Sequence, residues 1–145
     1  MHPPSRSLTA AAAVCFGIAL LHVAIIFMGP DGYTYFGAPQ LGVAESRGSV
    51  IPDIETAVLV LIFATFGAYA LSGAGRMRRL PLLRVALVLI GAVFTVRGLV
   101  FFVQVAQLAA GTGAPPRHAV FSLVSLITGV AFLSGTLPRW GRFRG

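Results

Sequence analysis

Four long apolar runs, separated by polar connections, make up most of this 145-residue chain. They cover residues 8–28, 55–72, 82–106 and 119–137. A helix needs about 20 apolar residues to cross a hydrocarbon core roughly 30 Å thick, and each run is close to or above that length. The pattern therefore predicts an all-α membrane protein in which four transmembrane helices form a bundle, one integral membrane domain over residues 1–145.

The first run follows a short polar start with one arginine, Arg6, and this arrangement is also found in secretory signal peptides. A signal peptide has a shorter apolar segment, followed by small residues at a cleavage site. The run over 8–28 is longer than that, and no convincing cleavage site follows it. We therefore expect an uncleaved first transmembrane helix.

Small residues four positions apart recur within the apolar runs. Such pairs allow two helix backbones to approach closely in a membrane, so they are expected to mark helix contacts. The pairs are Ala13 with Gly17, Ala64 with Ala68, Ser125 with Gly129, and Ala131 with Gly135.

The one long connection, residues 29–54, is predicted to form a structured cap on the extracytoplasmic surface. Turn-forming residues at 29–32 should end the first helix. Pro39 is suited to begin a short helix that runs through Glu45, with Gly48 ending it. Three aromatic residues that are typical of a membrane interface should hold the cap on the bilayer and act as its lid: Tyr33, Tyr35 and Phe36.

Composition excludes several function classes. Hydrophobic residues are 57% of the chain and charged residues 10%, against about 25% charged in soluble domains, so lipid must cover much of the surface. The net charge of +7 does not indicate nucleic-acid binding, because the arginines lie in short connections beside apolar runs. Cys15 is the only cysteine, which excludes an intramolecular disulfide and a cysteine-based zinc site. We expect neither a cofactor nor a metal ion.

The distribution of arginine predicts the orientation, because cytoplasmic loops of membrane proteins are enriched in basic residues. Most arginines lie on the side that holds both termini and the 73–81 loop, so we expect that side to be cytoplasmic. The opposite side carries Arg47 and Arg117. We expect a protein of a bacterial inner membrane, which could pair with a copy of itself or another membrane protein. Six arginines are expected to contact anionic lipid: Arg76, Arg78, Arg79, Arg139, Arg142 and Arg144.

Arg97 is the one arginine set well inside an apolar run. At a rise of about 1.5 Å per residue it lies roughly 12 Å from the outward end of its helix. A charge at that depth is costly and needs a partner. A structural ion pair with Glu55 or Asp53 and a ligand-binding role are the two interpretations.

Polar residues on all four predicted helices converge on the outer half of the bundle. The set contains His22, Asp53, Glu55, Arg97, Gln104, Ser122 and Ser125. Each has a structural alternative: His22 as a hydrogen-bonded packing residue, the carboxylates as helix-start residues, and the serines bonded to carbonyls of their own helix. Together they form a candidate functional cluster, because intramembrane ionisable residues are usually functional.

Three classes of function follow from this cluster. The first is a non-enzymatic binding or accessory protein whose outward cluster recognises a lipid, a small ligand or a partner protein. The alternative is a small transporter or channel component with Arg97, Glu55 and His22 in its path, although the inner half offers few polar residues for one. An enzyme is least favoured, because no metal-ligand spacing, nucleophile set or phosphate-binding loop is apparent.

Overall fold

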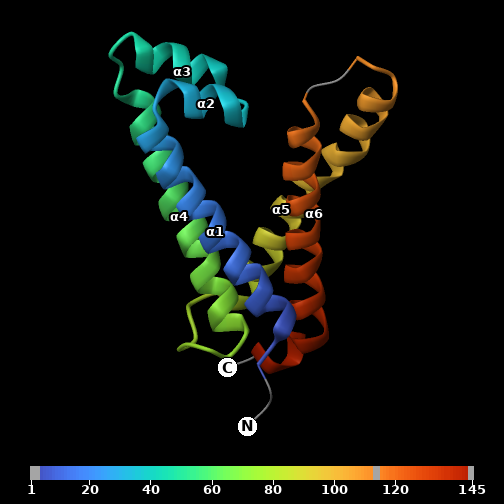
Figure 1. Cartoon of the computed structure of the whole chain (residues 1–145). Coiled ribbons are helices and arrows are strands. Elements are labelled where there is room, and N and C mark those ends of the chain that lie inside the picture. Colours follow the sequence, from blue (N-terminus) through green and yellow to red (C-terminus); the bar gives the residue numbers. More distant parts are fainter. Residues whose placement is uncertain (1–3, 113–114, 144–145) are drawn as a thin grey trace. The chain divides into compact units, whose positions relative to one another are not determined.

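The computed structural model describes residues 4–112 and 115–143, without the side chains of residues 140, 142 and 143. This part of the chain is all-α (Figure 1). Its six α-helices and one 3₁₀ helix are α1 (Arg6–Met28), α2 (Pro30–Phe36), α3 (Pro39–Ser46), α4 (Ile51–Gly73), α5 (Leu83–Ala109), α6 (Pro116–Thr136) and η1 (Leu137–Phe143).

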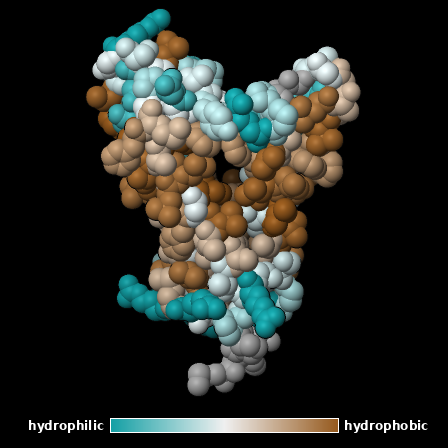
Figure 2. All heavy atoms as spheres, in the orientation of Figure 1, coloured by the Kyte–Doolittle hydropathy of each residue, from teal (hydrophilic) through white to brown (hydrophobic). Residues whose placement is uncertain are grey.

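Four of these helices, α1, α4, α5 and α6, are long and apolar enough to cross a membrane. Their surfaces carry large exposed apolar side chains, such as Phe27 at 86% and Leu61 at 68% exposed. Hydrophobic residues cover the long helices and hydrophilic ones gather near helix ends (Figure 2). Apolar exposure on this scale suits lipid as the surrounding solvent.

The boundaries of these helices confirm the predicted runs and correct their starts. The helix predicted from residue 55 begins at Ile51, because Pro52 is tolerated in the first turn and Ser49 Oγ accepts the Ile51 N–H at 3.3 Å. The helix predicted from residue 119 begins at Pro116, again a proline in the first turn. The third begins at Leu83 rather than 82.

The chain divides into two compact units. Unit 1 comprises Met1–Ala13 and Ala68–Gly145, and unit 2 comprises Val14–Gly67. Both α1 and α4 contribute to each unit, so these units are not separate stretches of chain. The single membrane domain expected from the sequence stays a prediction.

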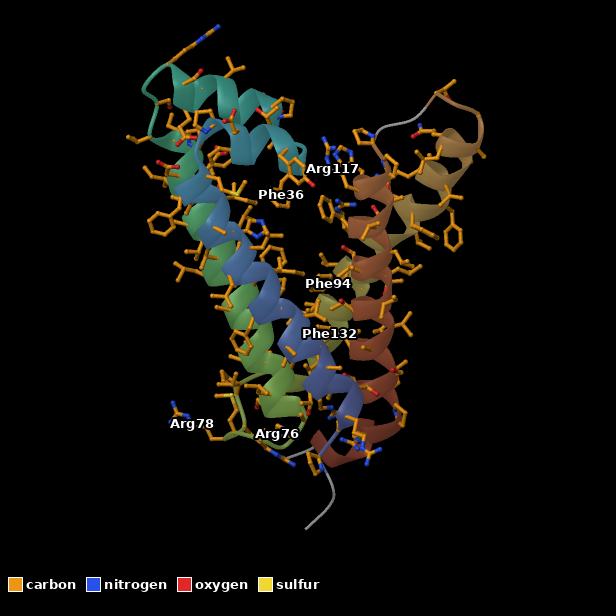
Figure 3. The ribbon with its side chains drawn as sticks, in the orientation of Figure 1. Phe36, Arg76, Arg78, Phe94, Arg117 and Phe132 are labelled. Atoms are coloured by element: carbon orange, nitrogen blue, oxygen red, sulfur yellow. The ribbon has the colours of Figure 1, made fainter. Side chains whose placement is uncertain are left out.

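In unit 1, α5 and α6 pack against each other at close range through glycines. A Cβ on Gly98 would collide with the backbone of Leu126, and one on Gly129 would collide with Thr95. The rings of Phe94 and Phe132 stack farther along the pair, with centroids 6.0 Å apart (Figure 3). Gly129 thus confirms one predicted contact face, whereas nothing lies within 4 Å of a Cβ on Gly17.

Unit 2 contains the two short helices of the 29–54 segment. The first helix ends at Met28, before the turn-forming residues as predicted, and Gly29 has φ +64°. Pro30 then begins α2 directly, so residues 30–32 are helical. The second short helix, α3, begins at Pro39 as predicted, and Gly48 follows its end with φ +82°. A Cβ on Gly42 would lie 2.6 Å from the Pro30 carbonyl oxygen, so this glycine allows α3 to pack on α2.

Candidate functional site

Arg97 on α5 contacts α6 through a single hydrogen bond. Its Nη1 donates to the Oγ of Ser122 at 3.0 Å, and Ser122 is fully buried while the arginine side chain remains exposed. The structural alternative for Ser122 was a hydrogen bond to a carbonyl of its own helix; its oxygen instead accepts from the guanidinium. The structure thus brings together two members of the predicted cluster, Arg97 and Ser122, which the sequence had not paired.

The close approach of α5 and α6 explains why this contact forms. Gly98 follows Arg97 and faces the backbone of Leu126, which lies one helical turn beyond Ser122. A side chain on Gly98 would hold the two backbones apart. The glycine therefore sets the spacing at which the guanidinium reaches the buried serine.

No carboxylate side chain belongs to unit 1. The four acidic residues of the chain, Asp31, Glu45, Asp53 and Glu55, all lie within Val14–Gly67. The guanidinium stays charged at any accessible pH, and the neutral hydroxyl of Ser122 cannot neutralise it. No side chain of unit 1 can therefore supply a counter-charge to Arg97.

Gln104 Oε1 on α5 and His118 Nε2 on α6 are further buried polar atoms of this helix pair, and neither has a hydrogen-bond partner among the described residues. In the antiparallel register of Gly98 with Leu126, Gln104 falls level with Val120, two residues from both His118 and Ser122. Buried polar atoms are usually hydrogen-bonded, so each of these two atoms can still form a hydrogen bond. Sequence reasoning missed His118; its spacing of four residues from Ser122 could have found it.

Ser125 shows the alternative behaviour on the same helix. Its Oγ donates to the carbonyl oxygen of Phe121 at 3.1 Å, four residues earlier. This hydrogen bond is the one that the structural interpretation describes, and it distinguishes Ser125 from Ser122.

The remaining predicted residues lie in unit 2. His22 Nδ1 lies 2.8 Å from the carbonyl oxygen of Ile18, so that nitrogen carries the proton. The His22 ring packs on Phe63, with centroids 5.1 Å apart. Both contacts are those of a hydrogen-bonded packing residue. Glu55 is exposed on α4.

Tyr33 joins the short helix α2 to α4. It is only 2% exposed, and its hydroxyl donates to Asp53 Oδ1 at 3.0 Å. Tyr35 is 53% exposed and meets the ring of Phe36 edge-on at 5.0 Å. Tyr33 therefore holds the two elements together from within, whereas an interface anchor was expected at the surface.

Glu45, on α3, is a further member of this region that sequence reasoning did not single out. Its Oε2 is buried with no hydrogen-bond partner among the described residues, and its Oε1 lies 3.6 Å from where a Cβ on Gly29 would be. Burial, with the nearby charge of Asp53, raises the pKa of Glu45 above its ordinary value. No sequence signal marks this residue, because its burial depends on the fold of α2 and α3.

The candidate residues therefore form two sets. Arg97, Gln104, Ser122 and Ser125 belong to unit 1, whereas His22, Asp53, Glu55 and the aromatic residues of 33–36 belong to unit 2. The pairing of Arg97 with Glu55 stays a prediction. Comparisons with protein-family models, with characterised proteins and with solved structures found no match.

Proposed function

We propose that this chain is a small, non-enzymatic polytopic membrane protein that binds an anionic group at Arg97, in a binding or accessory role. In the proposed orientation both termini are cytoplasmic and the 29–54 segment is an extracytoplasmic cap. The observation that carries the proposal is the Arg97–Ser122 contact in a helix pair without any carboxylate side chain. For a charged arginine within an apolar helix, a neutral partner leaves the charge uncompensated, which favours an anion as a further partner.

The neighbouring atoms favour a ligand that also forms neutral hydrogen bonds. Gln104 Oε1 accepts a hydrogen bond, and His118 Nε2 donates or accepts one according to its tautomer. A lipid headgroup, a small carboxylate or phosphate ester, and an acidic side chain of a partner protein all meet this description.

Native mass spectrometry of the detergent-purified protein tests the proposal. The wild type should retain an anionic molecule that Arg97→Gln loses. Arg47→Gln is the matched control, because it removes the same charge from an exposed residue outside the cluster. Equal retention by both variants would contradict the proposal.

A double-mutant cycle separates ligand binding from an internal ion pair. If Arg97 pairs with Glu55, Arg97→Ala and Glu55→Ala should each destabilise the protein by about 3–5 kcal/mol, and their effects should not add. Additive effects would leave the anion to an external ligand. A strong coupling without any bound molecule would make the pair purely architectural.

The alternative of a transporter or channel component receives less support. Its proposed path includes His22, but the Nδ1 proton of that residue is held by Ile18 and its ring packs on Phe63. A proton or ion relay would need this ring to be free to exchange partners.

A further inference from the structure

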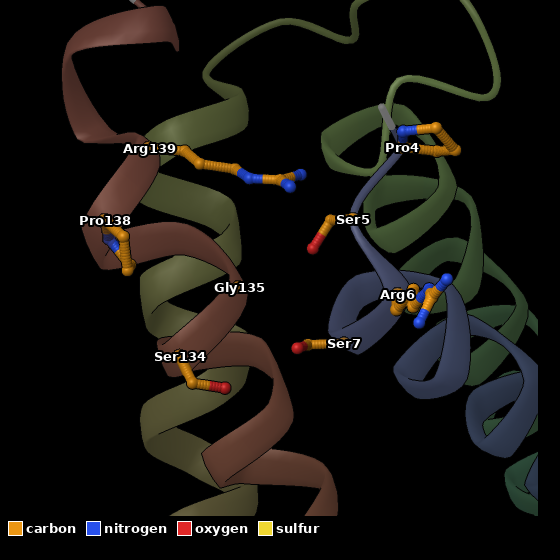
Figure 4. A pocket seen from close by; sticks show the side chains of 8 residues that line it. All are labelled: Pro4, Ser5, Arg6, Ser7, Ser134, Gly135, Pro138 and Arg139. Carbon is orange, nitrogen blue, oxygen red and sulfur yellow. The ribbon is translucent and has the colours of Figure 1, made fainter. Parts of the chain in front are cut away.

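A hollow of about 520 Å³ opens in unit 1 between the start of α1 and the end of α6 (Figure 4). Arg139 extends across it toward Ser5, and the side chains of Ser7 and Ser134 point toward each other. Arg6 lines this hollow and also a second one of about 460 Å³, to which Thr9 and Arg76 contribute. Arg76 Nε donates to Thr9 Oγ1 at 3.1 Å.

Buried contacts hold the walls of the larger hollow in place. Leu8 is fully buried, and a Cβ on Gly135 would lie 2.6 Å from its Cγ. Ser5 forms two hydrogen bonds: its N–H donates to the Ala74 carbonyl oxygen at 3.2 Å, and its Oγ accepts from the Leu8 N–H at 3.4 Å. These contacts hold the start of α1 against α6, and the packing of the two helices therefore defines the hollow.

The charge of the hollow is unbalanced. Among the described residues, Arg6 and Arg139 have no ion-pair partner, and unit 1 has no carboxylate side chain to supply one. The first turn of α1 adds the partial positive charge of a helix N-terminus. Guanidinium groups match the geometry of phosphate oxygens, and the Ser7 hydroxyl adds a neutral donor.

We propose that this hollow binds a phosphate ester of net negative charge, with Arg6 and Arg139 as the charged groups and Ser7 as a further donor. The volume exceeds that of a phosphate ion, so the phosphate belongs to a larger molecule. The same chemistry is offered by an anionic phospholipid headgroup and by a soluble phosphate ester. This site does not depend on the proposed role of Arg97, from which it differs in every residue.

Binding to the full-length protein in detergent micelles tests the assignment. Short-chain phosphatidylglycerol is titrated with the fluorescence of Trp140, the only tryptophan, as the signal. The double variant Arg6→Gln/Arg139→Gln should raise the apparent Kd at least about tenfold, because two charge-assisted hydrogen bonds are lost. The control Arg47→Gln/Arg117→Gln removes the same charge from residues that neither line the hollow nor belong to the arginines expected to contact anionic lipid, and should change the Kd less than about twofold.

Two further arms identify the source of the phosphate. Glycerol 3-phosphate that competes with the lipid, and binds as tightly, would indicate a soluble phosphate ester. Phosphatidylglycerol that binds while glycerol 3-phosphate does not would indicate a lipid headgroup. Equal weakening by the two double variants, or equal binding of phosphatidylcholine, would overturn the proposal, because either result means that the arginines act only through general charge.

A measurement on the wild type covers the case in which the double variant does not fold. Phosphatidylglycerol should protect Arg6 and Arg139, but not the exposed Arg47, from modification by phenylglyoxal, as read from peptide masses. Equal protection of Arg47 would overturn the assignment.

Discussion

Replacement of Gly98 by alanine tests the close packing of α5 on α6. The added Cβ would lie 2.6 Å from Leu126 Cβ and closer still to the Leu126 backbone, where ordinary contact begins near 3.4 Å, so the helices must separate by at least about 0.8 Å. The other nearest atoms are the backbone N and Cα of Leu126, and no rotamer change can move them away. The substitution therefore acts on the whole helix pair.

Gly17→Ala is the matched control, because it makes the same change inside a transmembrane helix where nothing lies within 4 Å of the new atom. Both variants gain the same helix propensity, up to about 1 kcal/mol relative to glycine. Gly98→Ala alone carries the cost of overpacking, about 1–3 kcal/mol. The free energies of unfolding of the two variants should differ by that amount.

The assay is unfolding by sodium dodecyl sulfate in mixed micelles, followed by Trp140 fluorescence. Gly98→Ala should unfold at a lower detergent fraction than the wild type, and Gly17→Ala at the same or a higher one. Separation of the helices should also break the Arg97–Ser122 hydrogen bond, so adding Ser122→Ala should cost little more. Equal stability of the two glycine variants would refute the close contact of the backbones.

Three further changes test single contacts. Ser122→Ala should lower the free energy of unfolding by about 1–2 kcal/mol, because it leaves the Arg97 guanidinium without its acceptor. Ser125→Ala should change the free energy of unfolding by less than about 0.5 kcal/mol. Equal effects of the two substitutions would contradict the difference between the serines. Because the pKa of Glu45 is raised in the folded protein, folding of the 29–54 segment favours the protonated form of Glu45. Protection of this segment from hydrogen exchange, corrected for intrinsic rates, should therefore fall as the pH rises from the ordinary carboxyl range through the raised pKa. Glu45→Gln should abolish this dependence, and a variant as pH-sensitive as the wild type would exclude Glu45 as its source. Leu82 has φ +52° and is 79% exposed, so Leu82→Asn should stabilise the protein by about 1 kcal/mol in thermal unfolding; a lower melting temperature would show that its side chain contributes contacts.

The length and placement of the long helices were predictable because they depend on local properties of the chain. Apolar runs of spanning length, and the proline and glycine that bound 39–48, act within one segment and need no partner. Even the helix starts at Ile51 and Pro116 were missed only by a few residues, since proline is compatible with a first turn as well as with a break.

The roles of individual polar residues were decided only by the tertiary structure. Ser122 and Ser125 lie three residues apart on one helix and looked equivalent in the sequence, yet only Ser122 meets Arg97. The difference comes from the register of α5 on α6, which Gly98 sets by its missing side chain. In the same way, Tyr33 and the Oε2 atom of Glu45 become buried because Gly29 turns the chain into α2 and Gly42 allows α3 to pack beside it. Which side chains meet across two helices depends on how closely their backbones approach, and that distance is a property of the pair rather than of either sequence segment.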